Sequence, residues 1–177
     1  MIRTGIFGGS FNPIHNGHIS LALQLKERAG LDEVWLMVSP QNPLKQSGDL
    51  LADDLRLHMA RLAVEGVEGI TVSDYEMHLP RPSYTWNTLE ALSTDYPERQ
   101  FVLMIGGDNW AIFDRWYHAD DIRRKYEIIV YTRTPGEPGF IDLSSTAVRE
   151  RIRQGRSIRS MVPWAVADFI KQHGLYA

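Results

Sequence analysis

Continuous apolar runs alternate along this chain with segments whose apolar residues recur at helical spacing. A short apolar run bounded by turn residues is typical of a strand that is buried on both faces of a parallel sheet. The clearest run of this kind, 101–105, leads directly into two glycines. The predicted strands are the run that stops at Gly8 and Gly9, followed by 33–38, 70–72, 101–105 and 128–131.

Helical periodicity fills the intervals between these runs. Small polar residues or proline mark helix beginnings, and glycine marks helix ends. We expect Asp53 and Ser83 to cap the second and third helices, and we expect 55, 59, 62 and 63 to face inward on the second. The predicted helices are 19–29 ending at Gly30, 53–65, 84–92, 144–152 and one that begins at Pro163.

Strands that alternate with helices predict a doubly wound parallel α/β sheet with right-handed crossovers. We expect one domain over residues 1–177, with a C-terminal helical portion. Ligands of such sheets bind outside the carboxyl ends of the strands, near the point where the strand order reverses. Loops that follow strands are therefore the places to look for chemistry.

Composition narrows the class of protein. The chain has 44% hydrophobic and 23% charged residues, which is ordinary for a globular protein. It has no cysteine, so disulfides and thiolate metal sites are excluded. A net charge of -3 gives no signal for nucleic-acid binding. Because no segment resembles a membrane span or signal peptide, we expect a cytoplasmic protein without a membrane partner.

The first strand leads into the turn of residues 8–14, and a helix follows. Glycine allows the backbone to approach an anion, and a helix N-terminus offers unpaired N–H groups and a positive dipole end. His15 and His18 lie at this helix start, one turn apart and on a common face. The segment is predicted to bind polyphosphate through the turn residues Gly8, Gly9, Ser10 and Phe11 and the two histidines.

Other candidate residues also follow strands. Lys45 lies on a proline-containing loop after the second strand, where regular structure is excluded. Gly106 and Asp108 follow the fourth strand, and the carboxylate is placed to bind ribose hydroxyls or to cap the next helix. Four aromatic residues follow just beyond, and most of them are expected to be core: Trp110, Phe113, Trp116 and Tyr117.

Positive charge is concentrated late in the chain. Residues 144–177 contain six basic and two acidic residues, which indicates either a solvated helix face or a second contact for an anion. The hydroxyl-rich segment 144–146 opens a predicted helix, and Arg149 lies one turn later on the same face. Ser144, Ser145, Thr146 and Arg149 are therefore candidate phosphate ligands.

Two of these segments match motifs of a known superfamily. The string from Gly9 to His18 resembles the G-[ST]-F-[DN]-P-x-H-x-G-H signature of the nucleotidylyltransferases, with Asn12 where Asp is more frequent. Residues 143–149 resemble its I-S-S-T-x-x-R motif, with Leu143 in place of Ile. Two motifs in this order, near opposite ends of the chain, are an unlikely coincidence. The resemblance implies a Rossmann-like nucleotidylyltransferase domain.

The middle of the chain is similar to one family within that superfamily, the bacterial nicotinate-nucleotide adenylyltransferases. Residues 82–89, 105–108 and 113–117 resemble its S-Y-T-x-x-T-L, G-x-D and W-Y elements. The resemblance implies that backbone amides near Tyr84 and Thr85 receive the nicotinate carboxylate, while Trp116 stacks on the pyridine ring. The implied substrates are ATP and nicotinate mononucleotide, which give nicotinate adenine dinucleotide and pyrophosphate.

The implied chemistry needs positioning and charge stabilisation rather than a general base, since a phosphate is already a nucleophile at pH 7. We assign His15, His18 and Arg149 as catalytic, with Lys45 near the leaving pyrophosphate. Mg²⁺ would be held mainly by ATP oxygens and water, with no metal site built from protein side chains. His58, His78, His118 and His173 show no ligand spacing and are expected to be ordinary residues.

Alternatives remain at this point. Phosphopantetheine adenylyltransferase shares the H-x-G-H element, and a non-catalytic nucleotide-binding module would keep the same fold. The glycine spacing disfavours a dehydrogenase. The segment 134–143 is shorter than the corresponding segment of the family, so the resemblance does not determine which residues form the adenine pocket. Nothing in the sequence excludes a homo-oligomer.

Overall fold

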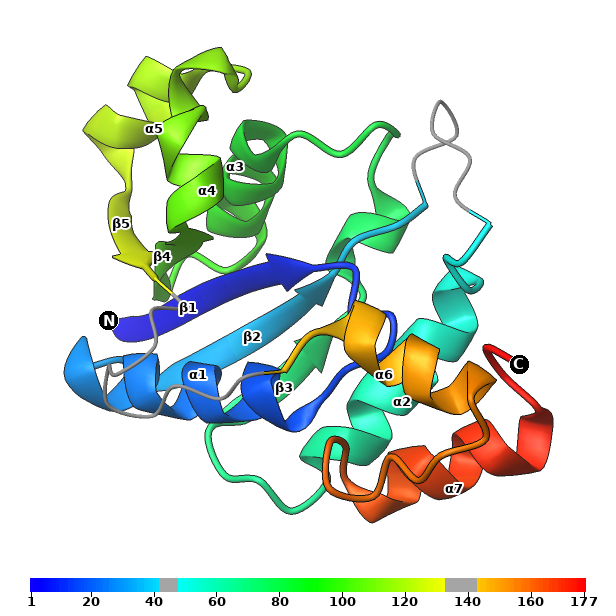
Figure 1. Cartoon of the computed structure of the whole chain (residues 1–177). Coiled ribbons are helices and arrows are strands. Elements are labelled where there is room, and N and C mark those ends of the chain that lie inside the picture. Colours follow the sequence, from blue (N-terminus) through cyan, green and yellow to red (C-terminus); the bar gives the residue numbers. More distant parts are fainter. Residues whose placement is uncertain (42–47, 133–142) are drawn as a thin grey trace.

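A computed structural model describes residues 1–41, 48–132 and 143–177. Its centre is a five-stranded parallel sheet (Figure 1). All five predicted strands are confirmed. Their bounds are β1 Ile2–Gly9, β2 Glu33–Val38, β3 Ile70–Ser73, β4 Arg99–Gly106 and β5 Glu127–Tyr131.

The strand order is β3-β2-β1-β4-β5, so the chain adds strands on one side of β1 and then crosses to the other side. The reversal lies between β1 and β4, whose register pairs Phe7 with Met104. Both strands end in glycine, at Gly9 and Gly106. Their carboxyl ends therefore lie together at the switch point, where sheets of this kind bind ligands.

Helices cover both faces of the sheet, which confirms the doubly wound architecture (Figure 1). Alternate residues of each strand enter different cores: Val34 and Leu36 of β2 belong to one, Trp35 and Met37 to the other. One face carries α1 Asn16–Arg28, α2 Asp53–Val64, α6 Ser145–Arg153 and α7 Trp164–His173. The other carries α3 Thr85–Asp95, α4 Gly107–Ala111 and α5 Ala119–Lys125.

The C-terminal helical portion is confirmed, because α6 and α7 contribute Val148, Val166 and Ile170 to the first core. Gly30, Gly66 and Gly174 adopt positive φ beyond the ends of α1, α2 and α7, as helix-terminating glycines do. No helix among the described residues has both the length and the apolar character needed to cross a bilayer.

Several local predictions are wrong. Asp53 is the first residue of α2 rather than its cap, because its carboxylate binds two arginines. Ser83 does not cap α3, whose N-cap is Tyr84. Most of the four aromatics after β4 were expected in the core, but Trp110 and Tyr117 are exposed and Trp116 is half-buried. Only Phe113 is buried. The periodicity also missed α5 and the short 3-10 segments Tyr75–His78 and Phe113–Arg115.

Candidate active site

The two histidines after β1 build the beginning of α1. His15 is the N-cap, and its Nδ1 accepts a hydrogen bond from the Gly17 N–H at 3.0 Å. His18 Nδ1 accepts from the His15 N–H at 3.1 Å, so the pair forms a reciprocal capping box. With Nδ1 of each ring as acceptor, these bonds assign the proton of the neutral imidazole to Nε2. The rings stack with centroids 3.7 Å apart.

The structure explains why the H-x-G-H string has glycine at position 17. A Cβ at this position would lie 2.8 Å from Cε1 of His15, which is closer than a side chain tolerates. Gly9 is tight for a similar reason, since a Cβ there would lie 3.3 Å from the Phe11 ring. Glycine at these two positions lets the histidine and phenylalanine rings pack directly on the backbone.

The late hydroxyl-rich segment lies against the β1–α1 turn. Ser145 Oγ donates to the Pro13 carbonyl at 2.9 Å, and Arg149 NH1 donates to the Asn12 carbonyl at 2.8 Å. The Asn16 N–H also donates to the Met161 carbonyl at 2.9 Å. The two motifs therefore face a common region, although they lie far apart in sequence.

These bonds refine what the motif residues can do. Ser144 Oγ caps α6 by accepting from the Ala147 N–H, and its own proton remains a donor. The Ser145 hydroxyl donates its hydrogen bond to the Pro13 carbonyl, so in this arrangement it holds the turn rather than a phosphate oxygen. Thr146 is exposed and accepts from Arg149 NH2 at 3.2 Å. Arg149 thus links the two motifs.

A pocket of about 370 Å³ lies at the switch point. It is lined by the glycines at the ends of β1 and β4, by the beginning of α3 and by a half-buried tryptophan. Its lining includes the predicted residues Gly8, Gly9, Ser10, Gly106, Thr85 and Trp116. This volume suits a small organic ligand.

Some predicted residues lie outside this lining. Tyr84 is exposed and packs on Tyr117 with ring centroids 4.9 Å apart. Asp108 is exposed in α4, and its neighbour Asn109 lines the pocket instead. Phe11 is buried beside His18, with ring centroids 4.9 Å apart. Lys45 falls outside the described residues, as does almost all of the short segment 134–143 linked to the adenine pocket.

Some buried polar atoms near these motifs lack a hydrogen-bond partner in the described part of the chain. They include Ser83 Oγ, whose residue lines the pocket, and Arg149 Nε in the late motif. Buried polar atoms are normally satisfied, so donors left over in a candidate site are what a bound ligand would engage.

Sequence reasoning missed a buried arginine behind the glycine turn. Arg56 is fully buried in α2 and donates to the carbonyls of Leu51, Ser10 and Ser39, each at 2.8 Å. Its NH2 also pairs with Asp53 at 2.6 Å. Burial lowers the pKa of Arg56, and the neighbouring Asp53 carboxylate opposes that effect. Arg56 thereby ties the β1–α1 turn to both ends of the β2–α2 connection, at the carboxyl edge of the sheet.

Glu76 is a second missed residue. It lines the pocket, is 8% exposed, and accepts a hydrogen bond from Thr88 Oγ1 at 2.7 Å. Burial raises the pKa of Glu76, while the bond from Thr88 opposes the rise. Burial therefore disfavours the charged form of this carboxyl group.

Asn12, the position where the motif more often carries Asp, anchors the turn. Its Oδ1 accepts from Tyr176 at 2.6 Å and from the Leu51 N–H at 3.3 Å, while Nδ2 donates to the Asp49 carbonyl at 2.8 Å. An ionised aspartate could not supply that last donor. Burial raises the pKa of Tyr176, so the phenol stays protonated and donates.

The remaining four histidines all have protein neighbours. His58 packs on Phe169, and His173 bonds the carbonyl of the same residue at 3.0 Å. The other two face carboxylates: His78 lies 3.3 Å from Asp74, and His118 lies 2.6 Å from Asp121. Over residues 1–41, 48–132 and 143–177, no group of three or more His, Asp or Glu side chains gathers in a metal-binding arrangement.

Comparisons with known proteins agree with this geometry. The model of the cytidylyltransferase-like family matches residues 6–151. A probable nicotinate-nucleotide adenylyltransferase of Bacteroides fragilis is 48% identical over 96% of this chain and 92% of its own length. One from Bacteroides thetaiotaomicron is 44% identical over 97% and 92%. Plasmodium falciparum nicotinic acid mononucleotide adenylyltransferase, solved with NaAD, superposes with a TM-score of 0.78 at 18% identity, covering 99% and 98% of the two chains.

Proposed function

This chain belongs to the cytidylyltransferase-like family, and we propose that it is a nicotinate-nucleotide adenylyltransferase of NAD biosynthesis. It transfers the adenylyl group of ATP to nicotinate mononucleotide. A phosphate oxygen of the mononucleotide attacks the α-phosphorus of ATP, and the bond to the β-phosphate oxygen breaks. The products are nicotinate adenine dinucleotide and pyrophosphate.

One observation carries the proposal: the two phosphate-binding motifs are joined at the edge of the sheet that holds the pocket. The bond from Ser145 to Pro13 and the bond from Arg149 to Asn12 fasten α6 to the turn. Gly8 and Gly9 of that turn line the pocket, as do Thr85 and Trp116. A triphosphate and a pyridine nucleotide could thus be held next to each other.

In this proposal the protein supplies positioning and charge stabilisation. The Nε2–H groups of His15 and His18 donate to the phosphates, with His18 nearest the α-phosphate in the pentacoordinate state. Donors fixed before the reaction stabilise developing charge without reorganisation. The capping bonds of both Nδ1 atoms provide such fixation. Arg149 supplies positive charge toward the leaving pyrophosphate.

Preference for the acid nucleotide over the amide nucleotide follows from the beginning of α3. Its N-cap, Tyr84, makes no side-chain capping bond, so the first backbone N–H groups of the helix are not engaged by that residue. Such a terminus favours a carboxylate over a neutral amide by about 0.3 to 1 kcal/mol, and by more when partly buried. Thr85, the first residue of α3, lines the pocket.

Mg²⁺ is proposed to enter the site bound to ATP. Among the described residues of the lining, the side-chain oxygens that could bind a cation belong to hydroxyls, amides and one carboxyl group, Glu76, which already accepts from Thr88. This set fits a cation held by phosphate oxygens and water rather than by the protein. Mg²⁺ would partly neutralise the phosphates. A cytoplasmic location is proposed because ATP is supplied there.

The test is release of pyrophosphate from ATP with three acceptors: nicotinate mononucleotide, nicotinamide mononucleotide and phosphopantetheine. We expect the highest kcat/KM with nicotinate mononucleotide. A higher kcat/KM with phosphopantetheine would indicate that the protein is a phosphopantetheine adenylyltransferase instead. Absence of pyrophosphate release with all three acceptors would indicate a non-catalytic module.

A further inference from the structure

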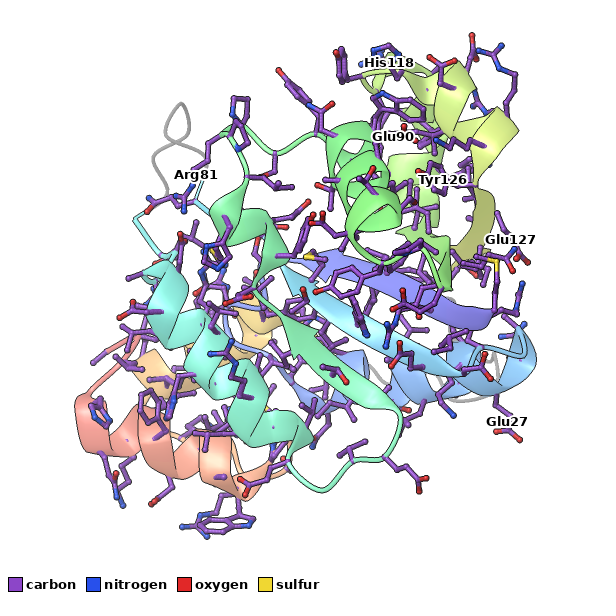
Figure 2. All side chains as sticks on the ribbon, turned by 180° about the vertical axis from the view of Figure 1, so that it is seen from behind. Glu27, Arg81, Glu90, His118, Tyr126 and Glu127 are labelled. Atoms are coloured by element: carbon purple, nitrogen blue, oxygen red, sulfur yellow. The ribbon has the colours of Figure 1, made fainter. Side chains whose placement is uncertain are left out.

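The pocket at the switch point has one cationic residue among its described lining, Arg81. It lies on the loop that leads into α3, near the beginning of α2 (Figure 2). Its side chain is 36% exposed, so the guanidinium is accessible at the pocket rim rather than buried. Neither phosphate motif contains this residue.

Arg81 is held in place by a carboxylate that is itself held. Asp53 Oδ2 accepts from Arg81 NH2 at 2.9 Å, while Oδ1 accepts from Arg56 NH2 at 2.6 Å and from the Gln41 N–H at 3.0 Å. Arg81 NH1 also donates to the Gln41 carbonyl at 3.4 Å. Two guanidinium groups share one carboxylate, so the cluster keeps a net positive charge beside the pocket.

The proposed reaction requires an anion in the pocket that Arg81 lines. With the pyridine ring at Thr85 and Trp116 and ATP at the glycine turn, the acceptor's phosphate would lie in this same pocket. Two phosphate-bearing substrates repel each other, and a fixed guanidinium at the pocket rim reduces that repulsion. Arg is suited to the role because its planar donors bind phosphate in pairs.

We propose that Arg81 binds the phosphate of the acceptor mononucleotide, and that Asp53 is a positioning residue that orients the Arg81 guanidinium. This inference rests on the proposed function, because it names a contact of the same substrate. The competing explanation is that Arg81 only fastens its loop to α2. In that case its loss would disturb every ligand of the pocket alike.

The experiment compares two probes that differ only by the phosphate: nicotinate mononucleotide and nicotinate riboside. Binding of each is measured by calorimetry to the wild type, Arg81→Gln and Arg81→Lys. Arg61→Gln is the matched control, because Arg61 is an exposed arginine that also pairs with an aspartate, Asp74, at 3.7 Å. Thermal unfolding of each variant confirms that it is folded.

We expect Arg81→Gln to weaken mononucleotide binding about 10- to 100-fold, as for loss of a charge-assisted hydrogen bond. Riboside binding should change less than about twofold, because the riboside makes no phosphate contact. Arg81→Lys should recover part of the loss, since it keeps the charge without the paired donors. Equal weakening of both probes, or no weakening of either, would overturn the proposal.

Asp53→Asn tests the positioning role in the pyrophosphate-release assay. We expect KM for the mononucleotide to rise while KM for ATP and kcat stay within about twofold. Asparagine keeps an Oδ1 acceptor for Arg56 and the Gln41 N–H, but its amide nitrogen cannot replace the Oδ2 acceptor that holds Arg81. An equal rise in both KM values would overturn the role of Asp53. If the wild type neither binds the mononucleotide nor releases pyrophosphate, the proposed function fails; a normal wild type with an unaffected Arg81→Gln refutes only this inference.

Discussion

Replacing the buried Arg56 with methionine should strongly destabilise the protein. The substitution keeps much of the side-chain length but removes every donor. Three carbonyl oxygens then lose a bond of 2.8 Å, and Asp53 loses an ion pair of 2.6 Å. A buried acceptor left unsatisfied costs about 1–3 kcal/mol, and breaking a buried ion pair costs about 3–5 kcal/mol.

The full sum will not be reached. Asp53 keeps its bonds from Arg81 and Gln41 and is 22% exposed, so its charge stays partly solvated. We therefore expect Arg56→Met to lower the free energy of unfolding by about 3–5 kcal/mol, a large part of a typical total of about 5–15 kcal/mol. Arg56→Lys should cost less, because it keeps the charge and some donors.

Urea denaturation followed by circular dichroism measures this loss. Arg61→Met is the matched control, since Arg61 is an exposed arginine of the same helix and its replacement should change stability by less than about 0.5 kcal/mol. A loss below about 1 kcal/mol for Arg56→Met, with an unchanged denaturant slope, would show that the three carbonyls are readily hydrated and that the clamp is not needed. KM for ATP in the same variant reports whether the Ser10 turn has moved.

Three further changes probe the pocket and the histidine pair. His18→Asn places Oδ1 where Nδ1 accepts from His15, so we expect kcat to fall about 10²- to 10³-fold with little loss of stability; near-normal turnover would refute the role of Nε2. Trp116→Ala should raise KM for nicotinate mononucleotide more than KM for ATP, whereas equal increases would indicate that the side chain only packs on Phe113. Because burial raises the pKa of Glu76 above its ordinary 4.5, the native protein keeps a proton that the unfolded chain has lost at pH values between 4.5 and the native pKa. Its stabilising contribution is then complete below pH 4.5 and is lost as pH rises through the native pKa. Glu76→Gln should lack this decline in urea stability, and parallel pH curves for the two proteins would contradict the assignment.

The sequence predicted the sheet well because each strand is a contiguous apolar run. Runs such as 33–38 and 101–105 are buried on both faces, and no other local structure satisfies that pattern as simply. The glycine turn could also be predicted from the sequence, since its residue types are set by the local geometry around His15 and Phe11. Short-range physics was enough for both.

Arg56 shows what local patterns do not predict. Apolar periodicity gave the inner face of α2 as 55, 59, 62 and 63, whereas Arg56, Met59, Ala60 and Ala63 are buried and Leu55 and Leu62 are only half-buried. Arginine at i, with Met59 and Ala60 at i+3 and i+4, does match a helical stripe. The sequence therefore contained a pattern that fits burial of Arg56. A prediction from sequence nevertheless places a charged residue at the surface, because the partners that would satisfy it when buried are not known. Those partners are three carbonyls, one from the β1–α1 turn and two from the β2–α2 connection.

The same limit applies to the motifs. A motif identifies Ser145 and Arg149 as functional candidates. It does not predict that the Ser145 hydroxyl donates to the Pro13 carbonyl, or that one guanidinium nitrogen of Arg149 donates to the Asn12 carbonyl. These bonds depend on how α6 meets a turn far away in sequence. The aromatic cluster after β4 failed for a related reason: hydrophobic character alone does not decide which rings lie over a core and which lie at a pocket or in solvent.

Stability and catalysis are coupled at this site, because the groups proposed to contact phosphate also build the fold. His15 and His18 each use one ring nitrogen to begin α1, and Arg149 uses one guanidinium nitrogen to fasten α6. Each has a second face whose donors are therefore fixed before substrate arrives, which is the condition under which a donor stabilises a transition state effectively. It follows that truncation to alanine at these positions confounds two effects. Only replacements that keep the inward acceptor or donor, as asparagine keeps an acceptor for histidine Nδ1, can measure the catalytic effect separately.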